Sequence, residues 1–166
     1  NVSGQSFGRA LEAQTTEQPY NIYDIQLVIN PKHDIVAGDV AVLSCYARKI
    51  STTDESGMGF IGPCYEENYG DYNKLASVTQ ELDDKWQKYY VLLAPRIKNF
   101  LVNKAQFTLR LGFKPQTIQL ADLKITNYHT KYKYDDVAPK SEPNDSYKGM
   151  EDGALWRKEA SCFTTK

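Results

Sequence analysis

Residues 105–128, AQFTLRLGFKPQTIQLADLKITNY, decide the fold of this chain. On both sides of Lys114-Pro115, apolar residues alternate with polar ones, and this period of two is typical of strands with one buried and one wet face. Pro115 has no N–H to donate to a ladder, so it belongs in the connection. The stretch predicts two strands joined by a short turn, with a slip in the alternation at Ala121-Asp122. The residues expected on the wet face are Arg110, Lys114, Gln116 and Gln119.

Similar alternating segments precede this stretch, separated by turns rich in Gly, Pro, Asn and Asp. The predicted strands are 9–15, 22–30, 40–50, 58–67, 75–82 and 86–94. We therefore predict an all-β jelly-roll sandwich of two antiparallel sheets, with about eight or nine strands over residues 8–128. Residues 1–8 are expected to form a flexible lead-in, and residues 129–166 an extended linker or C-terminal tail. Trp86 is expected in the core, and Trp156 in a short helical turn.

Composition narrows the classes of partner. The chain has 166 residues, of which 20 are Lys or Arg and 21 are Asp or Glu, so positive and negative charges nearly balance. Binding to a nucleic-acid backbone depends on clustered cations. No apolar run approaches the roughly 18–20 residues that span a bilayer. We expect neither nucleic acid nor a membrane as partner. Cys45, Cys64 and Cys162 match no zinc spacing, and a Cys45–Cys64 disulfide and two buried thiols are both open.

The sequence offers little catalytic machinery. There are two histidines, no G-x-S-x-G and no H-E-x-x-H. Adjacent carboxylates such as Glu66-Glu67 point to opposite faces of a strand, so they are not ready acid/base pairs. A binding module is favoured. A protein-interaction or adhesion sandwich and a small jelly-roll glycoside hydrolase or lyase are the alternatives.

Aromatic and polar residues together predict a sugar-binding groove. A flat ring covers the apolar C–H face of a sugar, while Gln and Arg bond its hydroxyls. The alternative for each tyrosine is a core position, because periodicity does not separate a groove from a core. We predict that Tyr23 and Tyr46 face the same sheet surface as Arg110. The full candidate set is Tyr23, Gln26, Tyr46, Arg48, Tyr65, Tyr69, Tyr72, Arg110 and Gln116.

Five segments, in order and spacing, carry a resemblance to a known family. They are GRAL (8–11), NIYDIQL (21–27), LSCYAR (43–48), KWQKY (85–89) and LGFKPQT (111–117). They resemble carbohydrate-binding modules of the family 4/9/22 jelly-roll type, which are attached to xylanases and glucanases. YKGMEDGALWRKEA (147–160) also looks like the join that leads into a family-10 xylanase barrel.

The resemblance implies a function as well as a fold. It implies a non-catalytic module that binds β-linked plant polysaccharide, xylan or β-glucan, and targets an attached hydrolase to it. It implies a secreted or cell-surface location and a structural calcium ion near Asp122. The ligand contacts that it implies are Tyr23, Gln26, Tyr46 and Arg110.

Overall fold

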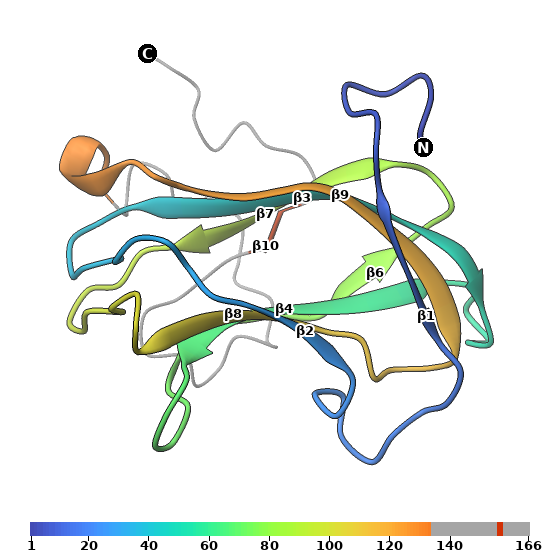
Figure 1. Cartoon of the computed structure of the whole chain (residues 1–166), viewed down its shortest axis with the longest axis horizontal. Coiled ribbons are helices and arrows are strands. Elements are labelled where there is room, and N and C mark those ends of the chain that lie inside the picture. The colour runs from blue at the N-terminus through green and yellow to red at the C-terminus, as the bar shows by residue number, and fades with distance from the viewer. Residues whose placement is uncertain (134–155, 158–166) are drawn as a thin grey trace.

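Two antiparallel sheets form the molecule in the computed structural model, which describes residues 1–133 and the backbone of residues 156–157. We name the two sheets A and B. Sheet A has the order β1 (Leu11–Thr15), β9 (Gln116–Asn127), β3 (Ala41–Thr52), β7 (Gln87–Leu93) and β10 (Trp156–Arg157). Sheet B has the order β2 (Gln26–Ile29), β8 (Ala105–Arg110), β4 (Gly59–Glu67) and β5 (Lys74–Ser77), and β6 (Gln80–Leu82) also pairs with β4. The sheets lie face to face as two layers (Figure 1).

The all-β prediction is confirmed, because nine strands lie between residues 11 and 127 in two antiparallel sheets. The predicted strand over 75–82 is two strands, β5 and β6, which pair with different parts of β4. The predicted helical turn at Trp156 is wrong, since the backbone of residues 156–157 pairs with β7. A single 3-10 turn follows β9 at His129–Lys131. The rest of the predicted tail lies outside the described residues.

The predicted slip in β9 is a bulge. Along β3, Ser44 pairs with Lys124 and Tyr46 pairs with Ala121, so two residues of β9 lie opposite one of β3. Asp122 is one of those two residues, and its φ of 49° is in the left-handed region. A bulge leaves an unpaired residue and bends its strand, which explains why the alternation in the sequence changes phase here.

The core fills the space between the sheets. Alternate residues of β3, namely Ala41, Leu43, Cys45 and Ala47, face it from sheet A, and Ile61, Phe107 and Leu109 face it from sheet B. Tyr65 belongs to the same core and is 1% exposed, so its predicted place in a surface groove is wrong. The physical reason is the alternation of β4, because Tyr65 points to the same side of the strand as the core residue Ile61.

The two described cysteines are free thiols. Cys45 faces the core from sheet A. Cys64 lies beside Arg110 and Glu66 on sheet B, and its Sγ is 3.2 Å from an oxygen of Glu66. Of the two alternatives, buried thiols are therefore present, and burial raises the pKa of each thiol to about 12. Cys162 lies outside the described residues.

Gln116 joins the two sheets instead of facing a ligand. It is 3% exposed at the start of β9, and its side-chain Oε1 accepts from the N–H of Phe60 at 2.8 Å while its Nε2 donates to the carbonyl of Phe60 at 2.7 Å. Gly59 leaves room for the Gln116 side chain to approach β4. A Cβ atom at residue 59 would lie only 3.3 Å from Oε1 of Gln116, which is a tight contact. The prediction of Gln116 as a sugar contact is wrong, since both ends of its amide already bond the backbone of β4.

Candidate functional site

The predicted site residues occupy two opposite faces of the sandwich. Tyr46 and Arg48 alternate with core residues of β3, so they point outward from sheet A. Arg110 alternates with core residues of sheet B and points outward on the other side. Tyr23 lies with Arg110, whose Cζ is 5.9 Å from the centre of its ring. The prediction that Tyr46 shares a surface with Tyr23 and Arg110 is therefore wrong, because Tyr46 lies on β3 of sheet A and Arg110 lies on β8 of sheet B.

On sheet B, the guanidinium of Arg110 is already engaged. Its Nη2 lies 3.1 Å from the carboxylate of Glu66 and 3.2 Å from Sγ of Cys64, and its Nη1 donates to Ser77 at 3.2 Å. Lys74 adds a second cation 3.5 Å from Glu66. The Arg110 and Glu66 side chains are only 11% and 6% exposed. This ion cluster therefore has little left to offer a ligand.

The other predicted residues near this face are exposed but scattered. Gln26 pairs with Arg110 across β2 and β8 and is open to solvent. Tyr69 and Tyr72 are each 47% exposed in the turn between β4 and β5, where Tyr72 has a φ of 52°. No ring contact between these tyrosines and Tyr23 is found in the described part of the chain. Sheet B has a ring pair of its own, Phe60 and Phe113, whose centres are 5.8 Å apart, and Phe113 lies over Gly62 beside Arg110. Within residues 1–133, no ring contact joins this pair to Tyr23, Tyr69 or Tyr72.

Glu66 and Glu67 point away from each other, as predicted for adjacent residues of a strand. Glu67 is 3% exposed and accepts hydrogen bonds from Lys98 at 2.7 Å, Asn73 at 2.7 Å and Tyr69 at 2.8 Å. Desolvation acts to raise the pKa of Glu67, but these three hydrogen bonds and the charge of Lys98 outweigh it and hold the pKa below its usual value. Glu67 is thus a fixed carboxylate that ties a turn to its strand.

Sheet A carries an aromatic platform, which we define as Phe7, Tyr46 and Trp86. The ring of Phe7 lies 4.8 Å from that of Tyr46 and 4.9 Å from that of Trp86, in an edge-on arrangement with the latter. The N-terminal segment that holds Phe7 crosses the outer side of sheet A (Figure 1). Trp86 is half-buried here, so its predicted core position is wrong. The contact with Phe7, distant in sequence, is what covers it.

A chain of polar side chains runs beside the platform across three strands. Arg48 of β3 lies 4.8 Å from the ring centre of Trp86 and donates from Nε to Gln119 of β9 at 2.9 Å. Gln119 in turn donates to Glu12 of β1 at 2.8 Å. On the other side, the ammonium of Lys88 lies 5.2 Å from the ring centre of Tyr46. Rings and hydrogen-bonding groups are therefore interleaved on one surface.

Several members of this surface were missed from the sequence. Gln119 was expected on the wet face of its strand, but nothing in the sequence connected it to Arg48. Trp86 and Lys88 lie directly before β7 and on it, and the alternation of that strand puts Lys88 on the face opposite to the core residues Tyr89 and Val91. That alternation is a signal that could have found them.

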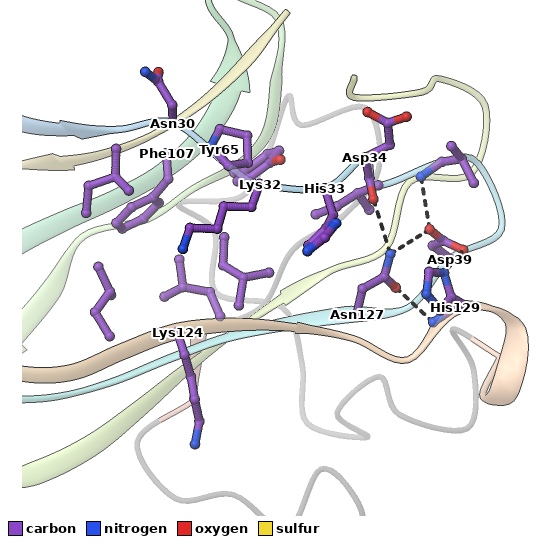
Figure 2. Close-up of a pocket in the computed structure, with 17 residues that line it drawn as sticks. Asn30, Lys32, His33, Asp34, Asp39, Tyr65, Phe107, Lys124, Asn127 and His129 are labelled. Carbon is purple, nitrogen blue, oxygen red and sulfur yellow. Dashed lines mark hydrogen bonds and ion pairs between the residues drawn. The ribbon is translucent and has the colours of Figure 1, made fainter. Parts of the chain in front are cut away.

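A cavity of about 840 Å³ opens between the ends of the two sheets. Its lining comes from the segment after β2 and from the second half of β9 (Figure 2). Of the predicted site residues, only Tyr65 lines it. The cavity is thus separate from both outer faces.

No group of three or more His, Cys, Asp and Glu side chains is arranged to hold a metal within the described residues. Asp122 lies on the bulge, 43% exposed, with Lys124 as an ion-pair partner at 3.8 Å. The calcium ion near Asp122 stays a prediction. In residues 1–133 we also find no helix long and apolar enough to cross a membrane.

Comparisons with known proteins point to the fold. No protein-family model matches the chain, and neither does any curated protein. Among solved structures, one described as CBM4 superposes with a TM-score of 0.59 at 14% identity, over 71% of this chain and 83% of that one. The N-terminal cellulose-binding domain of β-1,4-glucanase C from Cellulomonas fimi superposes with a TM-score of 0.55 at 13% identity, over 75% of this chain and 84% of that one. The chain is therefore similar in fold to carbohydrate-binding modules of the jelly-roll type.

Proposed function

We propose that this chain is a non-catalytic carbohydrate-binding module, and that the sugar chain lies on the outer face of sheet A over the aromatic platform. The observation that carries the proposal is the contact between half-buried rings and a polar chain on one sheet surface. Tyr46 and Trp86 supply the rings, and Arg48 and Gln119 supply donors and acceptors.

The chemistry of these residues suits a sugar. A pyranose has apolar C–H faces and a fringe of hydroxyls, so it needs a ring to cover the first and paired polar groups to answer the second. The amide of Gln119 and the guanidinium of Arg48 are held by each other and by Glu12, which fixes their positions before a ligand arrives. Groups that are ordered in advance lower the entropic cost of binding.

Sheet A is preferred to sheet B because of what a ligand would have to break. On sheet B, a sugar that bonded the guanidinium of Arg110 would compete with Glu66. Separating a partly buried ion pair costs several kcal/mol, about 3–5 where one partner is removed. On sheet A, a sugar hydroxyl would replace hydrogen bonds that are neutral or accessible to solvent. Breaking such bonds costs far less free energy than breaking the ion pair on sheet B.

The finer proposal concerns ligand and context. A β-linked plant polysaccharide, xylan or β-glucan, would suit the half-exposed surface around the aromatic platform, and the cellulose-binding domain that shares the fold supports this choice. Farther along the same face, Val42 and Leu92 are buried in a second apolar cluster. We further propose attachment to a glycoside hydrolase, a secreted or cell-surface location and a calcium ion near Asp122. Affinity is expected to be roughly micromolar to millimolar, or about −8 to −4 kcal/mol, since a shallow site buries little surface.

Affinity gel electrophoresis tests the proposal. Native gels that contain soluble xylan, β-glucan or mannan should retard the chain in at least one case, and reducing ends should not increase when the protein is incubated with the same polymers. Lack of retardation by every polymer would favour a protein-interaction sandwich. Release of reducing ends would favour a small hydrolase, and cleavage to unsaturated products would favour a lyase.

A further inference from the structure

The cavity between the sheets has an apolar wall and an open mouth. Ile29, Leu43, Phe107, Leu123 and Ile125 contribute to the wall, and Leu43 and Phe107 are buried core residues. A volume of about 840 Å³ lies within the range of roughly 300–1,000 Å³ that is usual for small-molecule sites. Such sites combine apolar walls with a few convergent polar groups, so the polar groups that line this cavity decide what it would take.

Most of the polar groups at the mouth are already satisfied by the protein. The carboxylate of Asp39 accepts from the N–H of Val36 at 3.1 Å and from the amide of Asn127 at 2.7 Å, and His129 lies 3.5 Å from its other oxygen. Asp34 accepts from the N–H of Val102 at 2.7 Å. The contacts of Asp39 with Asn127 and His129 lie at one side of the cavity, as Figure 2 shows. They hold the loop in place.

Four polar side chains of the lining make no hydrogen bond or ion pair within residues 1–133, namely Asn30, Lys32, His33 and Tyr65, and of these the Tyr65 hydroxyl is buried while Lys32 is charged. The hydroxyl of Tyr65 is buried and bonds to nothing in the described part of the chain, although Tyr65 is 1% exposed and lines the cavity. A buried donor with no partner is unfavourable, so a ligand acceptor at that point would stabilise the complex. Lys32 makes no ion pair or hydrogen bond with residues 1–133, and its side chain extends across the cavity, whereas Lys124 points away from it (Figure 2).

We propose that this cavity binds a small organic acid with an apolar body and a second oxygen at its far end. The carboxylate pairs with the ammonium of Lys32, the body packs against Phe107 and Ile125, and the far oxygen accepts the hydrogen bond of the Tyr65 hydroxyl. A cationic anchor, a hydroxyl donor and an apolar wall favour this class over a fully polar ligand such as a free sugar and over a hydrocarbon without oxygen. The site is independent of the platform on sheet A.

Calorimetric titration with four matched compounds tests this proposal. The probes are 10-hydroxydecanoate, decanoate without the far oxygen, 1,10-decanediol without the carboxylate, and 3-(4-hydroxyphenyl)propanoate with an aryl body. We expect 10-hydroxydecanoate or the aryl acid to bind tightest, and the better of the two identifies an alkyl or an aryl ligand. Equal affinity for the diol and the hydroxy acid, or no binding by any of the four, would overturn the proposal.

Two conservative variants assign the anchors. Lys32→Gln should weaken the hydroxy acid by about threefold to fivefold, as expected for an exposed ion pair, and leave the diol unchanged. Tyr65→Phe should bring 10-hydroxydecanoate and decanoate to the same affinity, a loss of about fivefold for the former. Lys85→Gln is the matched control, because Lys85 is exposed and does not line the cavity. The same loss in Lys85→Gln as in Lys32→Gln would show a non-specific charge effect and contradict the proposal.

Discussion

Substitution of Gln116 by alanine tests the reading of this residue as a structural link between the sheets. Its amide makes two hydrogen bonds to the backbone of Phe60, at 2.8 and 2.7 Å, and so imitates a rung of a β-ladder between β9 and β4. Alanine keeps the strand position but leaves both backbone groups of Phe60 without these partners. The expected result is a folded but less stable sandwich.

The size of the effect follows from these two contacts. A hydrogen bond contributes about 0.5–1.5 kcal/mol net, and a buried group left without a partner costs about 1–3 kcal/mol. Gln116→Ala should therefore destabilise the fold by about 2–4 kcal/mol. At about 2–4 °C per kcal/mol for a chain of this size, the melting temperature should fall by about 4–16 °C. Urea denaturation followed by far-ultraviolet circular dichroism measures the change in free energy of unfolding, and thermal unfolding followed by the same signal measures the melting temperature.

Gln119→Ala is the matched control on the same strand. Its amide lies on the outer face of sheet A and bonds Arg48 and Glu12. Contacts of that kind are usually worth less than about 1 kcal/mol, so stability should change little while affinity for polysaccharide falls. The reasoning would be refuted if Gln116→Ala were as stable as the parent chain, or if it lost sugar affinity while fully folded.

Three further predictions follow from the fold and its titratable groups. The thiols of Cys45 and Cys64 are buried, and their pKa values are raised to about 12. In a Cys162→Ser background they should resist a thiol reagent at pH 8 and react once urea unfolds the chain. Fast labelling of the folded protein would contradict their burial. The pKa of Glu67 is lowered in the folded state, so its contribution to stability is present above the unfolded pKa of about 4.3 and is lost as the pH falls through the folded pKa. Glu67→Gln should therefore flatten the decline of the urea midpoint between about pH 5 and 2.5. A decline as steep as that of the parent chain would refute this. Deletion of residues 1–8 removes Phe7 and should increase acrylamide quenching of Trp86. A Trp86→Phe variant isolates the emission of Trp156, which is subtracted. Unchanged quenching would show that Phe7 does not cover Trp86.

The fold was predictable because strand alternation is a local property. Residues 105–128 do form β8 and β9, and the slip at Ala121-Asp122 is the bulge in β9. The break between β5 and β6 was missed because pairing with different parts of β4 separates them, and the sequence of 75–82 contains no Gly or Pro to mark the break.

The candidate site was less predictable because alternation assigns a residue to a face of its own strand but not to a sheet. Tyr46 lies on β3 of sheet A, whereas Tyr23 lies in the turn before β2 and beside Arg110 of sheet B. Tyr65 has the apolar-plus-polar character of a ligand contact and is a core residue. Trp86 has the size of a core residue and is part of a surface, because Phe7 reaches it from the N-terminal segment.

The ring of Tyr46 is central to the proposed function, and a pair of substitutions on opposite faces tests it most directly. Burying one aromatic face contributes roughly 1.5–3 kcal/mol when complete and less on an open sheet, and each 1.4 kcal/mol is about tenfold in affinity. In calorimetric titrations with xylo- and cello-oligosaccharides, Tyr46→Ala should weaken binding by about tenfold or more while the protein stays folded. Tyr23→Ala, on sheet B, should bind within about twofold of the parent chain. A loss of binding in Tyr23→Ala with none in Tyr46→Ala would contradict the account and place the sugar on the opposite sheet.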